Sequence, residues 1–269
     1  MRILLFAPTA TSLYSRATAQ LIQGETGIEL DAIVVRSMWN WRRLRAELRR
    51  DGPRLIKKIR EKIILGAEAY PEVDSESMGA FVQRIGLPPG TLRSDARRWG
   101  IPCLVVPDHN HPGVTALLRS RMPQLTVFTG GGLIRQQVLD LAGAGVLNCH
   151  SGLLPAYRGM DVVEWPVLVE PGAAPQIGLT THWMDRGVDT GPILLRHQET
   201  LREGDTFETI RCRLEPRMPV LMLETLRGLR DDTLKPQPQT AEAGRQYFVM
   251  HPRFHAAAER KLARVTGGA

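Results

Sequence analysis

The sequence of 269 residues is poor in cysteine and has no long uninterrupted apolar run. Its three cysteines, Cys103, Cys149 and Cys212, are an odd and small number for a chain of this size. A disulfide framework is therefore not expected, and a reducing, cytoplasmic location is favoured. No stretch approaches the length of a membrane span, and the apolar residues 1–6 are too short for a secretory signal. We interpret residues 1–6 as part of a buried strand.

Signatures of several enzyme classes are also missing. No Gly-x-Gly-x-x-Gly follows the first strand, so a dinucleotide site has no support. No Gly-x-Ser-x-Gly surrounds Ser151, which argues against a serine hydrolase. His109 and His111 form a His-x-His beside Asp108, but no third and fourth ligands follow at convincing spacing. We therefore predict a polar loop there and no metal site, and leave a substrate-facing role open.

Positive charge is concentrated in one segment. The formal net charge is +7, and residues 41–62 hold ten Lys/Arg and three acidic residues, an excess equal to that of the whole chain. Such a patch attracts a polyanion, a phosphorylated substrate or an anionic surface. Leu44, Leu48, Leu55 and Ile59 recur at helical spacing. The interpretation we favour is therefore the solvated face of amphipathic helices.

Short apolar strands alternate with helices along the chain. The predicted strands span 2–8, 28–35, 102–106, 125–129, 146–148, 177–184 and 193–196; the predicted helices span 12–23, 77–85, 91–99, 112–121, 133–141, 162–169, 206–229 and 254–262. The helix at 206–229 is expected to have Asp205 as its N-cap and an interruption near Pro216 and Pro219. The alternation at 101–150 predicts an α/β fold with a Rossmann-like, mostly parallel sheet and helices on both faces.

The length suits one large α/β domain with a small appendage. We assign residues 1–230 to a catalytic domain that includes a basic helical segment at 37–95. Residues 231–269 are assigned to a linker and a short C-terminal extension. No internal repeat is present.

Polar side chains gather in the stretch from Val146 to Leu195. Asn148 and His150 follow a short apolar strand, and Asp189 lies in the loop after a later strand. Ligands of open α/β sheets bind at such strand ends. This part of the sequence is therefore the predicted functional site.

The motifs in this stretch resemble those of the folate-dependent formyltransferases, which include the methionyl-tRNA, glycinamide ribonucleotide and sugar-nucleotide N-formyltransferases. The matching motifs, in the family's order, are Asn148-Cys149-His150, Leu153-Leu154-Pro155, Tyr157-Arg158-Gly159 and Val188-Asp189-Thr190-Gly191. The resemblance covers residues 100–200 closely and the first strand loosely, and it implies that residues 37–95 are an insertion relative to the shorter members. The sequence departs from the family pattern at two places, and both affect the identity of the substrate more than the reaction itself. Gly152 stands where the family usually has Ser, with Ser151 one residue early, and the interval from His150 to Asp189 is a few residues longer.

The resemblance implies catalytic roles for Asn148, His150 and Asp189. Formyl transfer to an amine produces an oxyanion that needs donors and requires the attacking nitrogen to lose a proton. Asn148 supplies an amide donor, and His150 supplies a second donor that is stronger when protonated. Asp189 orients His150 and accepts the proton, directly or through water. Adjacent side chains of a strand point to opposite faces, so Cys149 is expected to be a buried apolar residue.

The resemblance also implies 10-formyltetrahydrofolate as the formyl donor. The residues that resemble the lining of its pterin slot are Gly131, Gly132, Leu133 and Ile134 on one side, and a loop with Asp185 and Val188 on the other. A simple strand-to-helix turn equally explains the glycines, and Asp185 is expected mainly to form its loop. The expected substrate contacts are Ser151, Arg158 and Met160, although for Arg158 we favour a role in holding the loop through carbonyl groups.

The acceptor we expect is a primary amine of a small biosynthetic substrate, such as a nucleotide-linked amino sugar or a specialised metabolite. About forty residues follow the long helix, too few for the C-terminal β-barrel of the tRNA formyltransferases. Glycinamide ribonucleotide is a less favoured acceptor, because the extra N-terminal segment and the altered loop argue against it. Two alternatives from other classes are a formyltetrahydrofolate hydrolase and a nucleic-acid-binding module. A nucleic-acid or membrane partner is not favoured, and a homodimer is left open.

Overall fold

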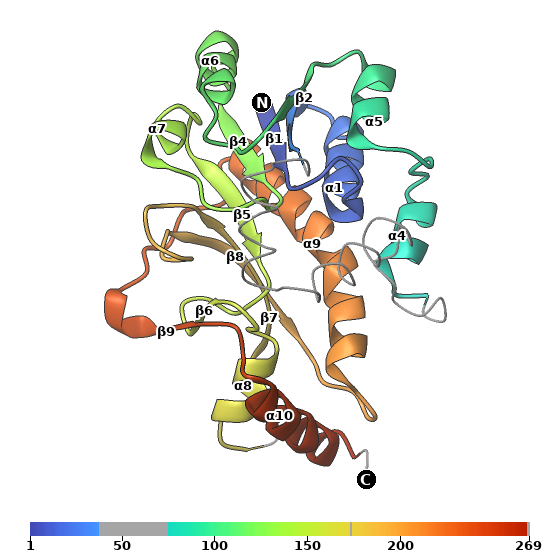
Figure 1. Cartoon of the computed structure of the whole chain (residues 1–269), viewed down its shortest axis with the longest axis vertical. Coiled ribbons are helices and arrows are strands. Elements are labelled where there is room, and N and C mark those ends of the chain that lie inside the picture. Colours follow the sequence, from blue (N-terminus) through green and yellow to red (C-terminus); the bar gives the residue numbers. More distant parts are fainter. Residues whose placement is uncertain (38–74, 173, 268–269) are drawn as a thin grey trace.

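A computed structural model describes residues 1–37, 75–172 and 174–267, so the basic segment 41–62 lies outside the described residues. A sheet with helices on both faces dominates this part of the chain (Figure 1). The strands are β1 (Arg2–Ala7), β2 (Glu29–Arg36), β3 (Cys103–Val106), β4 (Leu125–Phe128), β5 (Val146–His150), β6 (Tyr157–Gly159), β7 (Ile177–Trp183), β8 (Ile193–Glu199) and β9 (Arg245–Tyr247). The helices are α1 (Leu13–Gln23), α4 (Met78–Arg84), α5 (Leu92–Trp99), α6 (Pro112–Arg121), α7 (Gln136–Leu139), α8 (Glu164–Val169), α9 (Phe207–Arg230) and α10 (Pro252–Val265), with a 3₁₀ turn at Ala241–Ala243.

The main sheet has seven strands among the described residues, in the order β3-β2-β1-β4-β5-β7-β8. The first five are parallel to one another, whereas β7 is antiparallel to both β5 and β8. The predicted mostly parallel α/β sheet is therefore confirmed. At the antiparallel end of the sheet, the side chains of β7 stand directly opposite those of β5, where the predicted site residues lie.

Strand β1 shows why both faces of the sheet are covered. Its side chains from Ile3 to Ala7 are buried and alternate between two apolar clusters. Ile3 and Leu5 pack into the cluster with α1, α5 and α9, whereas Leu4 and Phe6 pack into the cluster with α6 and α7. Because β1 is apolar on both faces, helices must cover both, as is usual for a central parallel strand.

Two elements near the site differ from the predicted ones. Helix α7 spans only four residues, because the chain before it has positive φ at Gly130, Gly131 and Gly132. Strand β5 continues to His150 and does not end at Asn148, because both residues pair with β7. The predicted site residues therefore lie within a strand, where the sheet fixes their direction.

The prediction for α9 was wrong in two respects. The helix runs without a break through Pro216 and Pro219, both of which are buried with its apolar face. Tertiary packing of that face offsets the backbone hydrogen bonds that proline removes. The N-cap is Thr206, not Asp205, because the carboxylate of Asp205 forms a buried ion pair with Arg213 at 2.6 Å.

The segment after α9 is more than a linker. Its strand β9 pairs in parallel with β6, which lies in the loop that follows β5, and α10 packs on α8 (Figure 1). The sequence did not predict either strand of this second, two-stranded sheet. Within the described ranges, no helix is both long and apolar enough to cross a membrane.

Candidate active site

Alternation along β5 separates the reactive side chains from the core. Cys149 is buried in the apolar cluster on the sheet face covered by α1, α5 and α9, and burial raises the pKa of its thiol. Asn148 and His150 project from the opposite face of β5. The predicted burial of Cys149 is confirmed, and the strand itself brings Asn148 and His150 to the same side.

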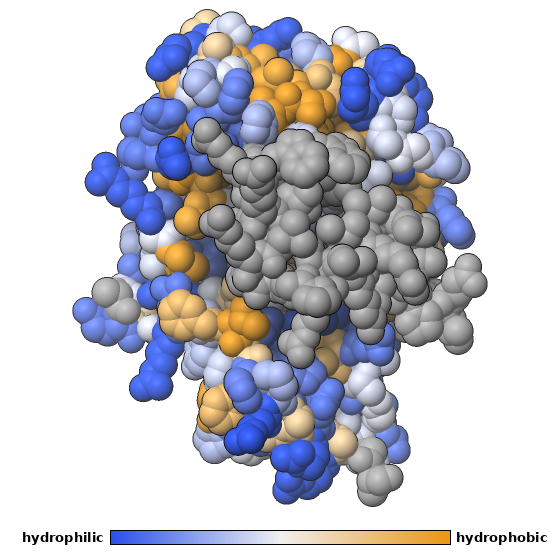
Figure 2. Space-filling model, in the orientation of Figure 1, coloured by the Kyte–Doolittle hydropathy of each residue, from blue (hydrophilic) through white to orange (hydrophobic). Residues whose placement is uncertain are grey.

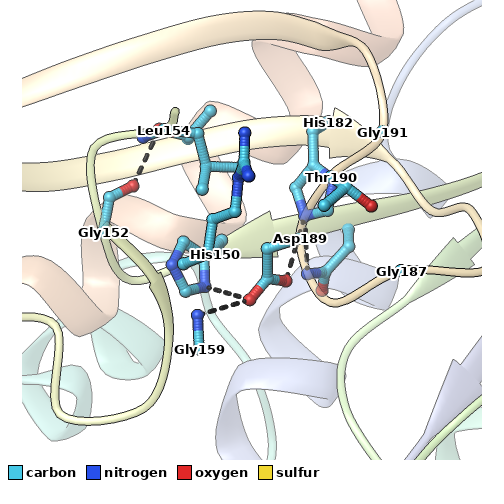
Figure 3. A network of polar contacts seen from close by, with 12 residues as sticks. His150, Gly152, Leu154, Gly159, His182, Gly187, Asp189, Thr190 and Gly191 are labelled. Carbon is cyan, nitrogen blue, oxygen red and sulfur yellow. Dashed lines mark hydrogen bonds and ion pairs between the residues drawn. The ribbon is translucent and has the colours of Figure 1, made fainter. Parts of the chain in front are cut away.

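Asp189 lies between two histidines (Figure 3). One carboxylate oxygen, Oδ2, is 3.5 Å from Nδ1 of His150, and the other, Oδ1, is 3.5 Å from Nε2 of His182. The backbone N–H of Gly159 donates to Oδ2 at 2.9 Å. The structure thus brings together the three predicted residues, Asn148, His150 and Asp189, and adds a histidine that the sequence reasoning missed.

His182 enters the site because β7 pairs with β5. It stands directly opposite Asn148 in the antiparallel ladder, and it is almost fully buried. Its Nδ1 is 2.9 Å from the Trp183 carbonyl, which only accepts, so Nδ1 carries a proton. Its Nε2 is 3.1 Å from Nδ2 of Asn148, where the amide N–H can donate to it. The two-residue period of the predicted strand at 177–184 was a signal for His182, because it places Thr180 and His182 on one face.

Two contacts set the orientation of the His150 ring. Its Nε2 lies 2.8 Å from the Tyr157 carbonyl and therefore donates to it, which leaves Nδ1 facing Asp189. Burial of the ring lowers the pKa of His150, although the charge of Asp189 acts in the opposite direction. At neutral pH Nδ1 therefore has a free lone pair. This lone pair suits a proton acceptor, whereas the role predicted for His150 from the sequence was that of a second donor that is stronger when protonated.

Asp189 is held as a carboxylate. Its burial opposes ionisation, but the neighbouring His182 and His150 and the Gly159 N–H together keep its pKa below the ordinary value. Its backbone has φ of 54°, a left-handed conformation that non-glycine residues seldom adopt. The loop at residues 184–192, called the Asp189 loop below, therefore holds its key residue in a specific backbone geometry.

The turn after β5, residues 151–156, is anchored by a buried hydroxyl. Thr180 Oγ1 donates to the Gly152 carbonyl at 2.8 Å and accepts from the Leu154 N–H at 3.0 Å. A side chain at Gly152 would place its Cβ 2.8 Å from His150 Nε2 and 2.9 Å from the Tyr157 carbonyl oxygen. Glycine at this position, a departure from the family pattern, is thus explained by the close contact between His150 and Tyr157.

The predicted folate-binding residues form two neighbouring loops. Gly131 and Gly132 have φ of 123° and 101°, and Leu133 is 79% exposed beside them. The Asp189 loop reaches this region, because Arg186 Nε donates to Gln136 Oε1 at 2.6 Å. Both predicted walls of the pterin slot therefore lie in one region of the molecule.

The remaining predicted site residues differ in exposure and in their hydrogen bonds. Asp185 accepts from the Gly187 N–H and the Thr190 hydroxyl, as expected of a loop-forming residue. Ile134 is buried, Val188 and Met160 are exposed, and Ser151 is partly exposed. Arg158 is buried and donates to the Thr240 carbonyl at 3.0 Å and to Gln239. This arrangement agrees with a role in holding the loop and does not present Arg158 to a substrate.

The histidines at 109 and 111 have structural roles. His109 is buried between Phe6 and Phe128, and its ring lies where a side chain at Gly131 would stand. His111 caps α6 by accepting from the Gly113 N–H at 3.1 Å. The residue between them, Asn110, bonds Leu133 O and the Arg135 N–H and so shapes the loop of the glycines. Among the described residues, no group of three or more His, Cys, Asp and Glu side chains could hold a metal ion.

Comparison with known proteins identifies the class of protein that this fold and site define. Residues 107–226 match the family model described as formyl transferase. Over 123 residues the chain is 34% identical to methionyl-tRNA formyltransferase of Pelobacter propionicus, a match that covers 45% of this chain and 38% of that relative. The predicted resemblance to the formyltransferases is therefore confirmed for this segment of the chain. It spans less than half the length of the curated relatives it matches.

Solved structures show the same fold. Phosphoribosylglycinamide formyltransferase from Bacillus halodurans matches with a TM-score of 0.55 at 18% identity, covering 85% of this chain and 95% of that one. The formyltransferase PseJ from Anoxybacillus kamchatkensis, in complex with UDP-4,6-dideoxy-4-formamido-L-AltNAc and tetrahydrofolate, matches with a TM-score of 0.50 at 20% identity. That match covers 66% of this chain and 94% of that one.

Proposed function

We propose that this protein transfers the formyl group of 10-formyltetrahydrofolate to a primary amine of a small biosynthetic substrate. The observation that carries the proposal is the convergence of Asn148, His150 and Asp189 inside the segment that matches the formyl transferase family. An amide donor, a neutral imidazole and a carboxylate are the groups that acyl transfer to an amine needs.

The chemistry divides among the three side chains. The Asn148 amide nitrogen has two hydrogens, of which one points to His182, so the other can polarise the formyl oxygen. The amine must lose a proton as it attacks, and Nδ1 of His150 or the carboxylate of Asp189 can accept it. A proton on Nδ1 creates an ion pair with Asp189 in a buried setting, which stabilises the charged intermediate.

The donor fits the two loops described above. When bound, 10-formyltetrahydrofolate supplies an activated one-carbon acyl group. We infer that Gly131, Gly132, Leu133 and Ile134 form one wall of its pterin slot. The Asp189 loop, with Asp185 and Val188, forms the other. Exposed Leu133 and Val188 offer apolar surface, while the glycines let the backbone approach closely.

For the acceptor we favour an amino sugar nucleotide or a specialised metabolite with an apolar portion. Met160 follows Gly159, whose N–H holds the Asp189 carboxylate, and its side chain is 55% exposed. Phe248 is 69% exposed on the segment after β9, and Figure 2 shows hydrophobic residues at the surface around β6 and α8. Apolar side chains exposed beside a reactive site are suited to binding a substrate.

The test is a panel of primary amines incubated with 10-formyltetrahydrofolate, with formylated product measured by mass spectrometry. His150→Ala and Asp189→Ala should abolish turnover with the fold intact, whereas His255→Ala, a change at a partly exposed histidine of α10, should not. Full activity in either site variant would refute the mechanism. Release of formate without any amine would instead favour a formyltetrahydrofolate hydrolase.

Cofactor binding can be tested separately from the acceptor. We expect 5-formyltetrahydrofolate, a stable analogue, to raise the melting temperature in a saturable manner, because a ligand that binds only the folded state stabilises it. A well-folded protein that shows no shift would contradict the proposed donor.

A further inference from the structure

One side chain from the segment after α9 connects the two parts of the site that hold Asp189. The amide nitrogen of Gln239 donates to the carbonyl oxygens of Asp189 at 3.0 Å and of Gly191 at 2.6 Å. Its amide oxygen accepts from Nε and Nη2 of Arg158 at 3.4 and 3.3 Å. We propose that Gln239 is a positioning residue for the formyl transfer, a role that rests on the function proposed above.

The contacts of Gln239 lie where the backbone needs support. Asp189 has a left-handed φ, so its loop must be held by contacts other than its own conformational preference. Gln239 fixes two carbonyls of that loop, those of Asp189 and Gly191. The carboxylate can then reach both His150 and His182.

The Gln239 side chain also holds β6, the strand that donates a hydrogen bond to the Asp189 carboxylate. Gly159 donates its N–H to Asp189 Oδ2, and Gly159 follows Arg158 in β6. Arg158 is buried, and its guanidinium is held by Gln239 and the Thr240 carbonyl. Gln239 therefore fixes the position of the Asp189 backbone relative to β6. This is the strand whose Gly159 N–H binds the Asp189 side chain.

Other bonds keep this segment in place without the Gln239 side chain. The backbones of Gln237 and Ile193 exchange two hydrogen bonds of 2.8 Å, and β9 pairs with β6. The Arg158 bond to the Thr240 carbonyl also remains. Loss of the Gln239 amide should therefore leave the fold intact and act locally on Asp189.

The test variant is Gln239→Met, which is close in volume but lacks both donors and the acceptor. Gln237→Met is the matched control, because that side chain is exposed two residues away. We expect kcat for formyl transfer to fall at least about tenfold in Gln239→Met, as positioning losses commonly do. The KM values should stay within about twofold, and the control should match the wild type. An unchanged kcat, or an equal loss in the control, would overturn the proposal.

A second readout does not depend on turnover. The titratable groups that face His150 are Asp189 and His182. If Asp189 moves away, its charge supports the imidazolium less, so the NMR-titrated pKa of His150 should be lower in Gln239→Met than in the wild type or the control. An unchanged His150 titration would refute the positioning role. If the wild type forms no formylated product, the proposed function fails, but this titration still decides whether Gln239 positions Asp189.

Should Gln239→Met not fold, Gln239→Glu provides the kinetic test. That variant keeps an acceptor for Arg158 but has no N–H for the carbonyls of Asp189 and Gly191. The same loss of kcat is expected, and wild-type kcat in a folded Gln239→Glu protein would contradict the proposal.

Discussion

At the scale of single residues, the site depends on one carboxylate shared by two histidines. Asp189 lies 3.5 Å from both His150 and His182, and the Gly159 N–H binds the oxygen that faces His150. Both histidines also bond backbone carbonyls, at Tyr157 and Trp183. Their rings are thus fixed before any substrate arrives, as preorganised catalysis requires.

The charge of Asp189 can be removed without disturbing its backbone. Asparagine tolerates the left-handed conformation at φ of 54°, so Asp189→Asn should fold normally. We expect kcat to fall about 100-fold or more, because the proton acceptor and the partner of His150 are lost together. Asp232→Asn is the matched control, with the same φ at an exposed position. Steady-state kinetics and circular dichroism would check both, and a control that loses as much activity would contradict the role of Asp189.

His109 gives the protein a specific dependence of stability on pH. Burial lowers the pKa of His109 to about 4 from an ordinary value of 6.5. The folded protein therefore binds this proton less readily than the unfolded chain. Its contribution to stability is complete above pH 6.5 and is lost as the pH falls towards 4. The two pKa values imply a loss of about 3 kcal/mol in the free energy of unfolding.

The variant His109→Asn isolates this contribution. Urea unfolding at pH 7 and at pH 4.5 should show a smaller difference in free energy for the variant than for the wild type. His111→Asn, a change of the same type at a helix cap, should keep the wild-type difference. Equal pH dependence in the wild type and His109→Asn would show that His109 is not the buried neutral base described here.

At the scale of elements, the antiparallel end of the sheet assembles the site. Because β7 runs opposite to β5, Thr180 faces His150 and His182 faces Asn148. Thr180 anchors the turn after β5, and His182 contacts Asn148 and Asp189. The pairing of β7 with β5 therefore places Thr180 and His182 beside His150 and Asn148.

Thr180→Val tests the anchoring of that turn. Valine has nearly the same shape but leaves the Gly152 carbonyl and the Leu154 N–H without their buried partner. We expect the free energy of unfolding to fall by about 2–4 kcal/mol, the cost of two unsatisfied buried groups. Thr233→Val, at an exposed threonine, should change it by less than about 0.5 kcal/mol. Urea denaturation measures both, and equal losses would contradict the anchoring role.

Sequence patterns predicted the strands and helices that bury regular apolar faces, including β1, β2 and α5. They failed where tertiary contacts decide the outcome. The helix predicted at 133–141 is shorter in the structure, because the glycines and Asn110 keep its first part irregular. Pro216 and Pro219 suggested a break in α9 that packing prevents.

The candidate site was predictable in part. Asn148, His150 and Asp189 follow from the ordered motifs, whereas His182 becomes visible only when β7 is paired against β5. Gln239 has no local signal, because its role depends on contacts with Asp189 and Arg158, which are far away in the sequence. The ring orientation of His150 also depends on a carbonyl, at Tyr157, that no motif specifies.

At the scale of the whole molecule, the seven-stranded sheet and the segment after α9 are joined through aromatic contacts. Trp165 of α8 lies 5.2 Å from the Tyr247 ring and 6.2 Å from the Phe254 ring, measured between centroids. Its indole N–H donates to the Phe248 carbonyl at 2.9 Å. Trp165 thus connects β9, the start of α10 and the region next to the site.

Trp165→Ala should loosen that segment without unfolding the sheet. Each aromatic pair contributes about 1 kcal/mol, so amides at 245–265 should exchange with solvent at least about tenfold faster. Amides of β1 and β4 should keep their protection, and Trp99→Ala on α5 should leave residues 245–265 unchanged. Hydrogen exchange followed by mass spectrometry measures this, and uniform loss of protection would indicate global destabilisation instead.

The pairing of β6 with β9 also has a consequence for protein synthesis. The ribosome produces β6 and every reactive side chain before it reaches Gln239 and β9, since α8, β7, β8 and α9 lie between them in the chain. A nascent chain therefore carries the reactive groups before it has the residues that fix their positions. The proposed formyl transfer should therefore reach its full rate only after these later residues have left the exit tunnel.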